Sequence, residues 1–149
     1  LWKTKFDKMI TATTSIRVRF AETDAMGVVY HANYLPWCEV ARLELIESIG
    51  LNYRNINEQG YHLPVLEEYL HYKFPAKYDD IVEIKATIKE RPAVRVKIEY
   101  EMRANGRVLV AGYTVHAFVD SRGMPVKPPK EIAKKLLDAY DADAGAEKK

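Results

Sequence analysis

The sequence predicts an α+β fold in which one long helix packs on a five-stranded antiparallel sheet. Three observations predict it. Residues 33–49 place apolar side chains at helical spacing, residues 93–104 alternate strictly between apolar and polar side chains, and Asn105-Gly106 is typical of a type I′ hairpin turn. No internal repeat or linker divides the chain, so we expect one domain over residues 1–149.

The first strand is expected at residues 13–20. Ile16, Val18 and Phe20 alternate there with two arginines, as in a strand with one face in water. An N-terminal arm at residues 1–12 would precede it. The strand leads into the only segment of the chain that combines acidic residues, a glycine and a histidine directly before a helix.

The central helix is expected to begin at Asn33, a residue type favoured at helix N-caps, and to end at Gly50, a typical terminator. Pro36 falls in the first turn, where proline is tolerated. One face of this helix is apolar and consists of Tyr34, Cys38, Ala41, Leu45 and Ile49. Because two of these side chains are small, a sheet can approach the helix closely.

Four more strands and a short helix are expected after a polar connector at residues 52–60. The strands are placed at residues 62–74, 81–90, 93–104 and 107–120, the helix at residues 127–140, and a flexible tail at residues 141–149. One long helix cannot cover both faces of such a sheet. The remaining apolar surface predicts a homodimer, with a dimer of dimers as the expected tetramer; the sequence leaves its arrangement open.

Composition favours a cytoplasmic protein. Lys and Arg number 23 against 21 Asp and Glu, which gives a net charge of +2 and no argument for a nucleic-acid partner. No apolar run is long enough to span a membrane, and no secretory signal is visible. A single cysteine cannot form an internal disulfide, which favours a reducing compartment.

The segment ETDAMGVVYHANYLPW, residues 22–37, is the candidate site. Asp24 and Gly27 stand where a strand turns into a helix whose first amides are unpaired and carry a partial positive charge. A carboxylate opposite such amides suits acyl transfer, because the acid attacks or activates water while the amides hold the oxyanion. The alternative is an aspartate that only stabilises the turn.

Residues 19–46 also carry a resemblance to a known family: RFAETDAMGVVYHANYLPWCEVARLELI is similar to the active-site signature of hot-dog-fold acyl-CoA thioesterases. It resembles most the 4-hydroxybenzoyl-CoA thioesterase-like branch, which includes small bacterial thioesterases linked to the Tol-Pal operon. The residues that match in order are Asp24, Gly27, Val28, Val29, Tyr30, His31, Asn33 and Tyr34. The resemblance extends over residues 13–138 and implies a hot-dog fold.

The resemblance implies a thioester hydrolase that needs neither serine nor cysteine, because Asp24 acts as nucleophile or general base. The sequence does not choose between these roles. The oxyanion would be held by amides at the turn and helix start, near Gly27 and at His31, and the His31 side chain is a further catalytic candidate. Candidate substrate-binding residues are Tyr30, Asn33, Arg91 and Lys127, the last two for the phosphates of coenzyme A, with plain surface charge as their alternative. Arg95 departs from the small polar residue usual in relatives.

Other reactive side chains are interpreted as structural. Cys38 lies in the apolar face of the helix and is expected in the core, and Glu22 is expected to be a solvated charge. His62, His71 and His116 stand apart, without the spacing of a zinc site. We therefore expect no metal and no cofactor, with coenzyme A present only as part of the substrate.

Three alternatives compete with an acyl-CoA thioesterase. The acyl group could be carried by acyl carrier protein instead of coenzyme A. A hydratase on the same fold is disfavoured, because its aspartate and histidine stand closer together than Asp24 and His31, which are seven apart. A non-catalytic acyl-CoA-binding module would not need Asp24 and would normally carry a DNA-binding segment. The length and aromaticity of the acyl group are left open.

Overall fold

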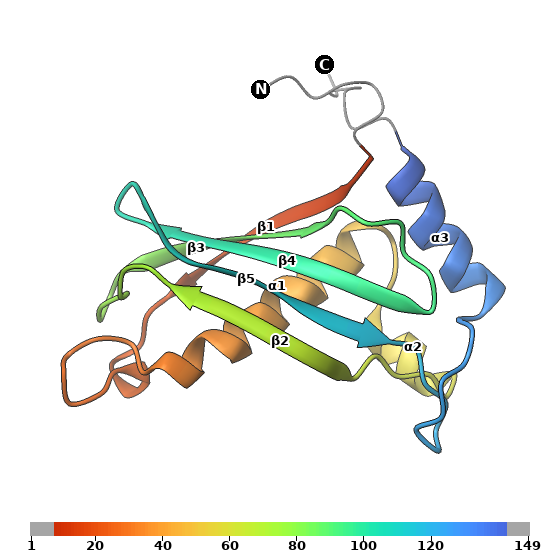
Figure 1. Ribbon diagram of the computed structural model, residues 1–149, viewed down its shortest axis with the longest axis horizontal. Coiled ribbons are helices and arrows are strands. Elements are labelled where there is room, and N and C mark those ends of the chain that lie inside the picture. Colours follow the sequence, from red (N-terminus) through yellow and green to blue (C-terminus); the bar gives the residue numbers. More distant parts are fainter. Residues whose placement is uncertain (1–7, 143–149) are drawn as a thin grey trace.

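The computed structural model describes residues 8–142. The strands β1 (Ile10–Arg17), β2 (Val65–Tyr72), β3 (Ile81–Ile88), β4 (Arg95–Ala104) and β5 (Arg107–Ala117) form one antiparallel sheet in the order β1-β3-β4-β5-β2. Helix α1 (Tyr34–Ser48) crosses one face of this sheet, as the resemblance to a hot-dog fold implies (Figure 1). Two short helices, α2 (Tyr53–Glu58) and α3 (Lys130–Asp141), complete the chain.

Helix α1 buries the predicted apolar face and two further side chains. Trp37 and Ile46 join the buried set, which widens the stripe, while Ile49 is only half-buried. The amide of Gly50 donates to the Glu47 carbonyl at 3.0 Å with φ of 83°, so the predicted helix end is confirmed. Asn33 stands at the N-cap of α1 as expected, but its side chain makes no capping bond to the helix and donates instead to the Glu22 carbonyl at 2.8 Å.

The first strand begins and ends three residues earlier than the sequence predicted. Ile10 already pairs with Ile88 of β3, so the expectation of an arm over residues 1–12 is wrong for residues 10–12, and residues 1–7 lie outside the described part. The chain leaves the sheet after Arg17, and Phe20 stands 76% exposed in a 3-10 turn. The alternation of apolar and polar residues continues to Phe20 although the strand has already ended, because the sequence does not distinguish an exposed Phe from a buried one.

The other boundaries are nearer the predictions. Asn105 and Gly106 both have positive φ, 53° and 77°, which confirms the hairpin turn between β4 and β5. The strand expected at residues 62–74 is shorter, and the connector at residues 52–60 contains helix α2, capped by the Asn52 side chain. Nine residues of polar character gave no helical period from which this helix could be predicted.

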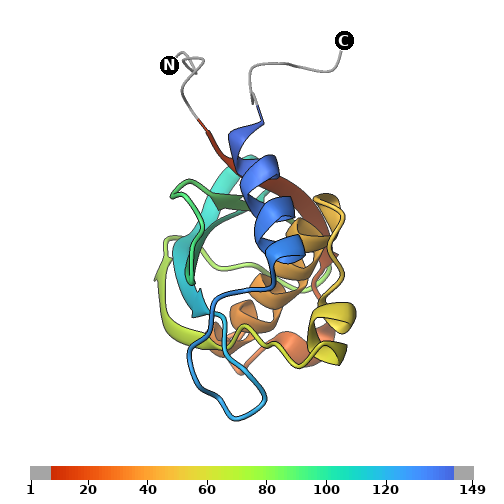
Figure 2. The same ribbon diagram turned by 90° about the vertical axis from the view of Figure 1, so that its right-hand side faces the viewer.

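Strand β2 is an edge of the sheet and is unusually exposed. Its neighbour is β5 on one side, and none of its side chains is fully buried. Val65, Leu66, Tyr69 and Tyr72 are each between 45% and 53% exposed. Helix α3 lies at the far end of the sheet from the start of α1 (Figure 1), and in the end-on view it lies to the side of β2, so it leaves this edge open (Figure 2). An apolar edge of this kind is typical of a surface that pairs with another strand.

A buried chain of hydrogen bonds joins β4, β5 and the segment before β2. His116 is 1% exposed; its Nδ1 lies 3.1 Å from the Leu63 carbonyl and its Nε2 lies 2.8 Å from the Thr114 hydroxyl. Because a carbonyl only accepts, Nδ1 donates and Nε2 accepts from Thr114, whose oxygen in turn accepts from Tyr100 at 2.8 Å. Burial, with the charge of Arg42, lowers the pKa of His116 to about 4.

This histidine makes the fold sensitive to acid. The unfolded chain protonates His116 near pH 6.5, whereas the folded chain resists protonation until about pH 4, so stability is lost as the pH falls between these values. We expect the free energy of unfolding to fall by about 2 kcal/mol between pH 6.5 and 4.5 from this group. Denaturant unfolding of the wild type and His116→Gln checks it: equal pH slopes would contradict the prediction.

Candidate active site

Asp24 stands in a tight turn between the 3-10 turn Phe20–Glu22 and the start of α1. Its amide donates to the Val28 carbonyl, and the Gly27 amide donates to its carbonyl, both at 2.9 Å. Gly27 has φ of 78°, a conformation that glycine adopts without strain. One carboxylate oxygen, Oδ1, accepts the Met26 amide at 2.8 Å. Within the described part of the chain, the other oxygen has no hydrogen-bond partner.

The turn faces a hollow of about 290 Å³ at the start of α1. Asp24, His31 and Tyr34 line it from the turn and the helix, and Tyr72 and Phe74 line it from the end of β2. The Tyr72 hydroxyl donates to the His31 carbonyl at 3.0 Å, and the two rings meet edge to face with centroids 6.4 Å apart. Strand β2 and the helix start are thereby held together around the hollow.

The His31 amide is the first of a 3-10 turn, His31–Asn33, that continues into α1. Such amides have no partner within the helix. Among residues 8–142, no oxygen accepts the His31 amide. The Gly27 amide, by contrast, is already bonded to the Asp24 carbonyl, so of the two candidate oxyanion donors only His31 retains a free N–H.

Glu22 contradicts its expected role as a solvated charge. It is 7% exposed, and its carboxylate accepts the Arg19 amide at 2.8 Å and the indole nitrogen of Trp37 at 2.7 Å. Burial alone would raise the pKa of Glu22, but these hydrogen bonds and the Arg19 charge outweigh it and lower the pKa below 4.5. Position in a strand could not reveal this, because the strand ends before Glu22.

Two other candidates lie beside the hollow rather than in it. The ring of Tyr30 packs on that of His31 with centroids 4.5 Å apart and is 46% exposed, outside the lining of the hollow. The side-chain amide nitrogen of Asn33 is bonded to the Glu22 carbonyl. These contacts assign Asn33 a part in shaping the turn.

The two candidate phosphate ligands lie at the other end of the molecule. Arg91 stands beside α3 and pairs with Asp141 at 2.8 Å. The hydrogen bond from Arg91 is the largest of the interactions that lower the pKa of Asp141. Lys127 lines a groove with Pro92 and the α3 side chain of Leu136. In Figure 1 this end is on the right and the Asp24 turn is on the left. One chain does not bring these basic residues to Asp24.

Sequence reasoning missed the stretch that lines the hollow from the end of β2 onward, Tyr72, Lys73, Phe74 and Pro75. Only the strand order could have shown that these residues lie beside Asp24. Strand β1, which precedes the site, and strand β2 are at opposite edges of the sheet, so they are not neighbours in it. Cys38 is buried as expected, and burial raises the pKa of its thiol to about 12, so it does not supply a thiolate nucleophile. Residues 8–142 contain no cluster of three or more potential metal-ligating side chains.

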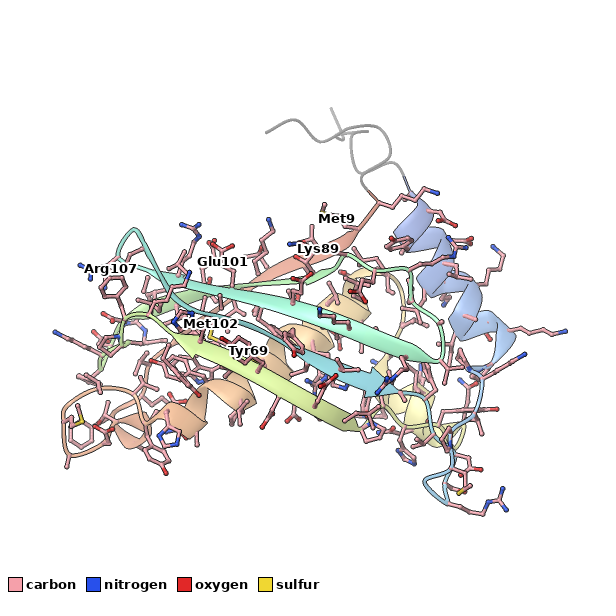
Figure 3. All side chains as sticks on the ribbon, viewed as in Figure 1. Met9, Tyr69, Lys89, Glu101, Met102 and Arg107 are labelled. Atoms are coloured by element: carbon pink, nitrogen blue, oxygen red, sulfur yellow. The ribbon has the colours of Figure 1, made fainter. Side chains whose placement is uncertain are left out.

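A larger hollow, of about 580 Å³, lies on the opposite face of the sheet from α1, among Tyr69, Lys89 and Glu101 (Figure 3). Size alone would favour it. It contains one ion pair between lining residues, in which Lys89 lies 3.8 Å from Glu99. It holds neither a carboxylate at a helix start nor a free helix amide, so we assign the chemistry to the smaller hollow.

Comparison with known proteins identifies the superfamily of this chain. Residues 18–136 match the family model of the thioesterase-like superfamily. The chain belongs to this superfamily. It is 31% identical to YneP of Bacillus subtilis over 141 residues, 94% of this chain and 100% of that protein. It is also 32% identical over 119 residues to YbgC of Haemophilus influenzae, which is named an acyl-CoA thioesterase, covering 78% of this chain and 88% of that protein.

Solved structures agree with the fold. A DHNA-CoA thioesterase from Staphylococcus aureus superposes with a TM-score of 0.77 at 33% identity, over 78% of this chain and 80% of that one. The superfamily match confirms the hot-dog fold and the thioesterase resemblance. The narrower link to the Tol-Pal branch stays a prediction. No helix in the described residues is long and apolar enough to cross a bilayer.

Proposed function

We propose that this protein is an acyl-CoA thioesterase, which uses water to cleave the thioester into a carboxylic acid and free coenzyme A. The observation that carries the proposal is the pairing of Asp24, which has one unbonded carboxylate oxygen, with the free amide of His31 in one hollow. A carboxylate and a helix-start amide are the two groups that hydrolysis of a thioester needs: one to form the new bond and one to hold the oxyanion.

Two routes are compatible with this geometry. As nucleophile, the free oxygen of Asp24 adds to the thioester carbon, the carbon–sulfur bond breaks, and the thiolate leaves as coenzyme A. Water then hydrolyses the mixed anhydride to the acid and restores the carboxylate. As general base, Asp24 takes a proton from water while the water oxygen attacks the same carbon; the carbon–sulfur bond then breaks, and coenzyme A leaves as a thiolate that takes up the proton. In both, the His31 amide stabilises the negative charge on the carbonyl oxygen, and the His31 ring orients Asp24 or the water.

The protein acts as a homodimer in this proposal, joined along β2. Two β2 edges that pair around a two-fold axis would run antiparallel, which covers the exposed Val65, Leu66 and Tyr69. Antiparallel pairing also brings the end of one chain that carries Arg91 and Lys127 toward the Asp24 end of the other. Phosphates of coenzyme A could then meet basic residues from both chains, including Lys73 at the hollow.

A double substitution on the β2 edge tests the dimer. Leu66→Lys with Tyr69→Lys places two charges on the proposed contact, and strand edges that carry lysine resist pairing. We expect the mass in solution to fall from twice 17.1 kDa to that of one chain, or from four chains to two for a dimer of dimers, with kcat/KM reduced at least about tenfold. Sedimentation equilibrium measures the mass. Tyr78→Lys, an exposed aromatic away from β2, is the control; a wild type that sediments as one chain would contradict the dimer.

The carrier of the acyl group is tested directly. The same acyl chains are offered on coenzyme A and on acyl carrier protein, with short, long and aromatic groups, and free thiol is measured. The proposal expects the higher kcat/KM on coenzyme A, and the panel identifies the preferred acyl class. Preference for acyl carrier protein would replace the substrate while keeping the reaction. Tight binding of acyl-CoA without thiol release would favour a binding module and contradict the proposed activity. The cytoplasmic location stays a prediction from cysteine content.

A further inference from the structure

Glu22 is a buried carboxylate that the proposed reaction does not use. Both of its oxygens are bonded, Oε1 to the Arg19 amide at 2.8 Å and Oε2 to the Trp37 indole at 2.7 Å, and the Arg19 guanidinium lies 3.4 Å from Oε1. Arg19 belongs to the segment that enters the site, and Trp37 belongs to the first turns of α1. The carboxylate therefore joins the two elements between which the Asp24 turn is held.

The main chain of Glu22 makes a second set of contacts. Its carbonyl accepts the Tyr30 amide at 2.9 Å and the Asn33 side chain at 2.8 Å. Tyr30 is the residue at which the chain leaves the Asp24 turn, directly before the His31 amide. One residue thus contacts the chain before the turn, the chain after it and the helix beyond it, and lies two positions from Asp24.

We propose that Glu22 is a positioning residue: its carboxylate, bonded to Trp37, holds Asp24 in place relative to the His31 amide. This inference rests on the thioesterase function proposed above. Hydrolysis requires the Asp24 oxygen near the thioester carbon while the amide bonds the carbonyl oxygen, and a displacement of about 1 Å can slow such a reaction by about a hundredfold. The buried hydrogen bond from the Trp37 indole to the Glu22 carboxylate is suited to prevent that displacement. Its acceptor is ionised, and a charge-assisted hydrogen bond is stronger than a neutral one.

The donors around Glu22 specify a carboxylate. The Arg19 amide and the Trp37 indole can only donate, and they address different oxygens of the same side chain. An ionised carboxylate accepts at both oxygens. A glutamine of the same shape accepts only at its oxygen and carries an NH₂ group in place of the second oxygen. That NH₂ group must then face either the Arg19 amide or the Trp37 indole, which are themselves donors.

The first test compares Glu22→Gln with the wild type in thiol release. We expect kcat to fall about ten- to a hundredfold with KM changed less than about threefold, because binding surfaces are retained while the reacting groups are displaced. The double variant Glu22→Gln/Trp37→Phe removes the N–H that opposes the new amide, so its kcat is expected to recover at least about threefold over Glu22→Gln alone. Glu44→Gln, an exposed glutamate on α1, is the matched control and is expected to keep the wild-type kcat.

A second readout does not depend on activity. The Met26 amide donates to Asp24, so its NMR resonance reports on the turn, and the Trp37 indole resonance reports on Glu22. Both are expected to shift in Glu22→Gln and not in Glu44→Gln. Equal kcat in these two variants, no recovery in the double variant, or an unmoved Met26 resonance would overturn the proposal. A wild type that releases no thiol would contradict the proposed function, and the Met26 and Trp37 resonances would still decide whether Glu22 holds the turn.

Discussion

Asp24→Asn is expected to lower kcat by about a thousandfold or more, with KM changed less than about threefold. The substitution removes the negative charge and keeps the size. Asparagine retains a side-chain oxygen that can accept the Met26 amide, so the turn is expected to survive. What is lost is the carboxylate oxygen that attacks the thioester or activates water. Thiol release under saturating substrate measures the effect.

A second aspartate in a matching turn provides a control for this variant. Asp120 forms the same turn as Asp24: the Asp120 amide donates to the Met124 carbonyl, and the Gly123 amide donates to the Asp120 carbonyl, both at 2.9 Å. Its Oδ1 accepts the Arg122 amide, as Asp24 accepts Met26. Asp120→Asn is therefore expected to leave kcat unchanged. Equal activities of the wild type, Asp24→Asn and Asp120→Asn would reduce Asp24 to a turn residue and remove the mechanism.

Gly112→Ala is expected to destabilise the fold by more than about 3 kcal/mol, or to prevent folding. Gly112 of β5 pairs with Leu70 of β2. A β-carbon there would overlap the Tyr69 carbonyl oxygen and lie 2.9 Å from the Leu70 α-carbon. Because both are backbone atoms of a paired strand, neither can move aside without separating β2 from the sheet.

Gly60→Ala separates this crowding from the usual cost of replacing glycine. Gly60 has φ of 86°, but a β-carbon at this position would meet no atom within 4 Å, so only backbone strain opposes alanine, at about 1 kcal/mol. Urea unfolding of both variants at one pH gives the comparison. If Gly112→Ala costs no more than Gly60→Ala, the close approach of β2 and β5 is not as described, and the position of Tyr72 in the hollow must be revised.

Local pattern predicted the fold well where side chains repeat. The strict alternation in β4 and the Asn105-Gly106 turn predicted the hairpin, and the small residues Cys38 and Ala41 indicated the helix face that meets the sheet. Pattern failed at the ends of elements. Phe20 continued an alternation that the backbone had already left, and helix α2 has too few apolar residues to show a period.

The candidate site could be predicted only in part for a different reason. The pattern Asp-x-x-Gly occurs at both Asp24 and Asp120 with the same backbone bonds, so the turn by itself does not identify a catalytic acid. What distinguishes Asp24 is the helix that follows it, which the sequence predicts from Asn33 onward. Glu22 was misjudged because its burial depends on Trp37, fifteen positions away, and the side chain of Asn33 was likewise assigned to the nearest helix rather than to the Glu22 carbonyl.

The most direct measurement is a crystal structure of Asp24→Asn with an intact acyl-CoA bound. We expect the thioester in the hollow at the start of α1, with its carbonyl oxygen about 3 Å from the His31 amide nitrogen and its carbonyl carbon beside residue 24. A thioester bound elsewhere, for example among Tyr69, Lys89 and Glu101 on the opposite face of the sheet, would contradict it.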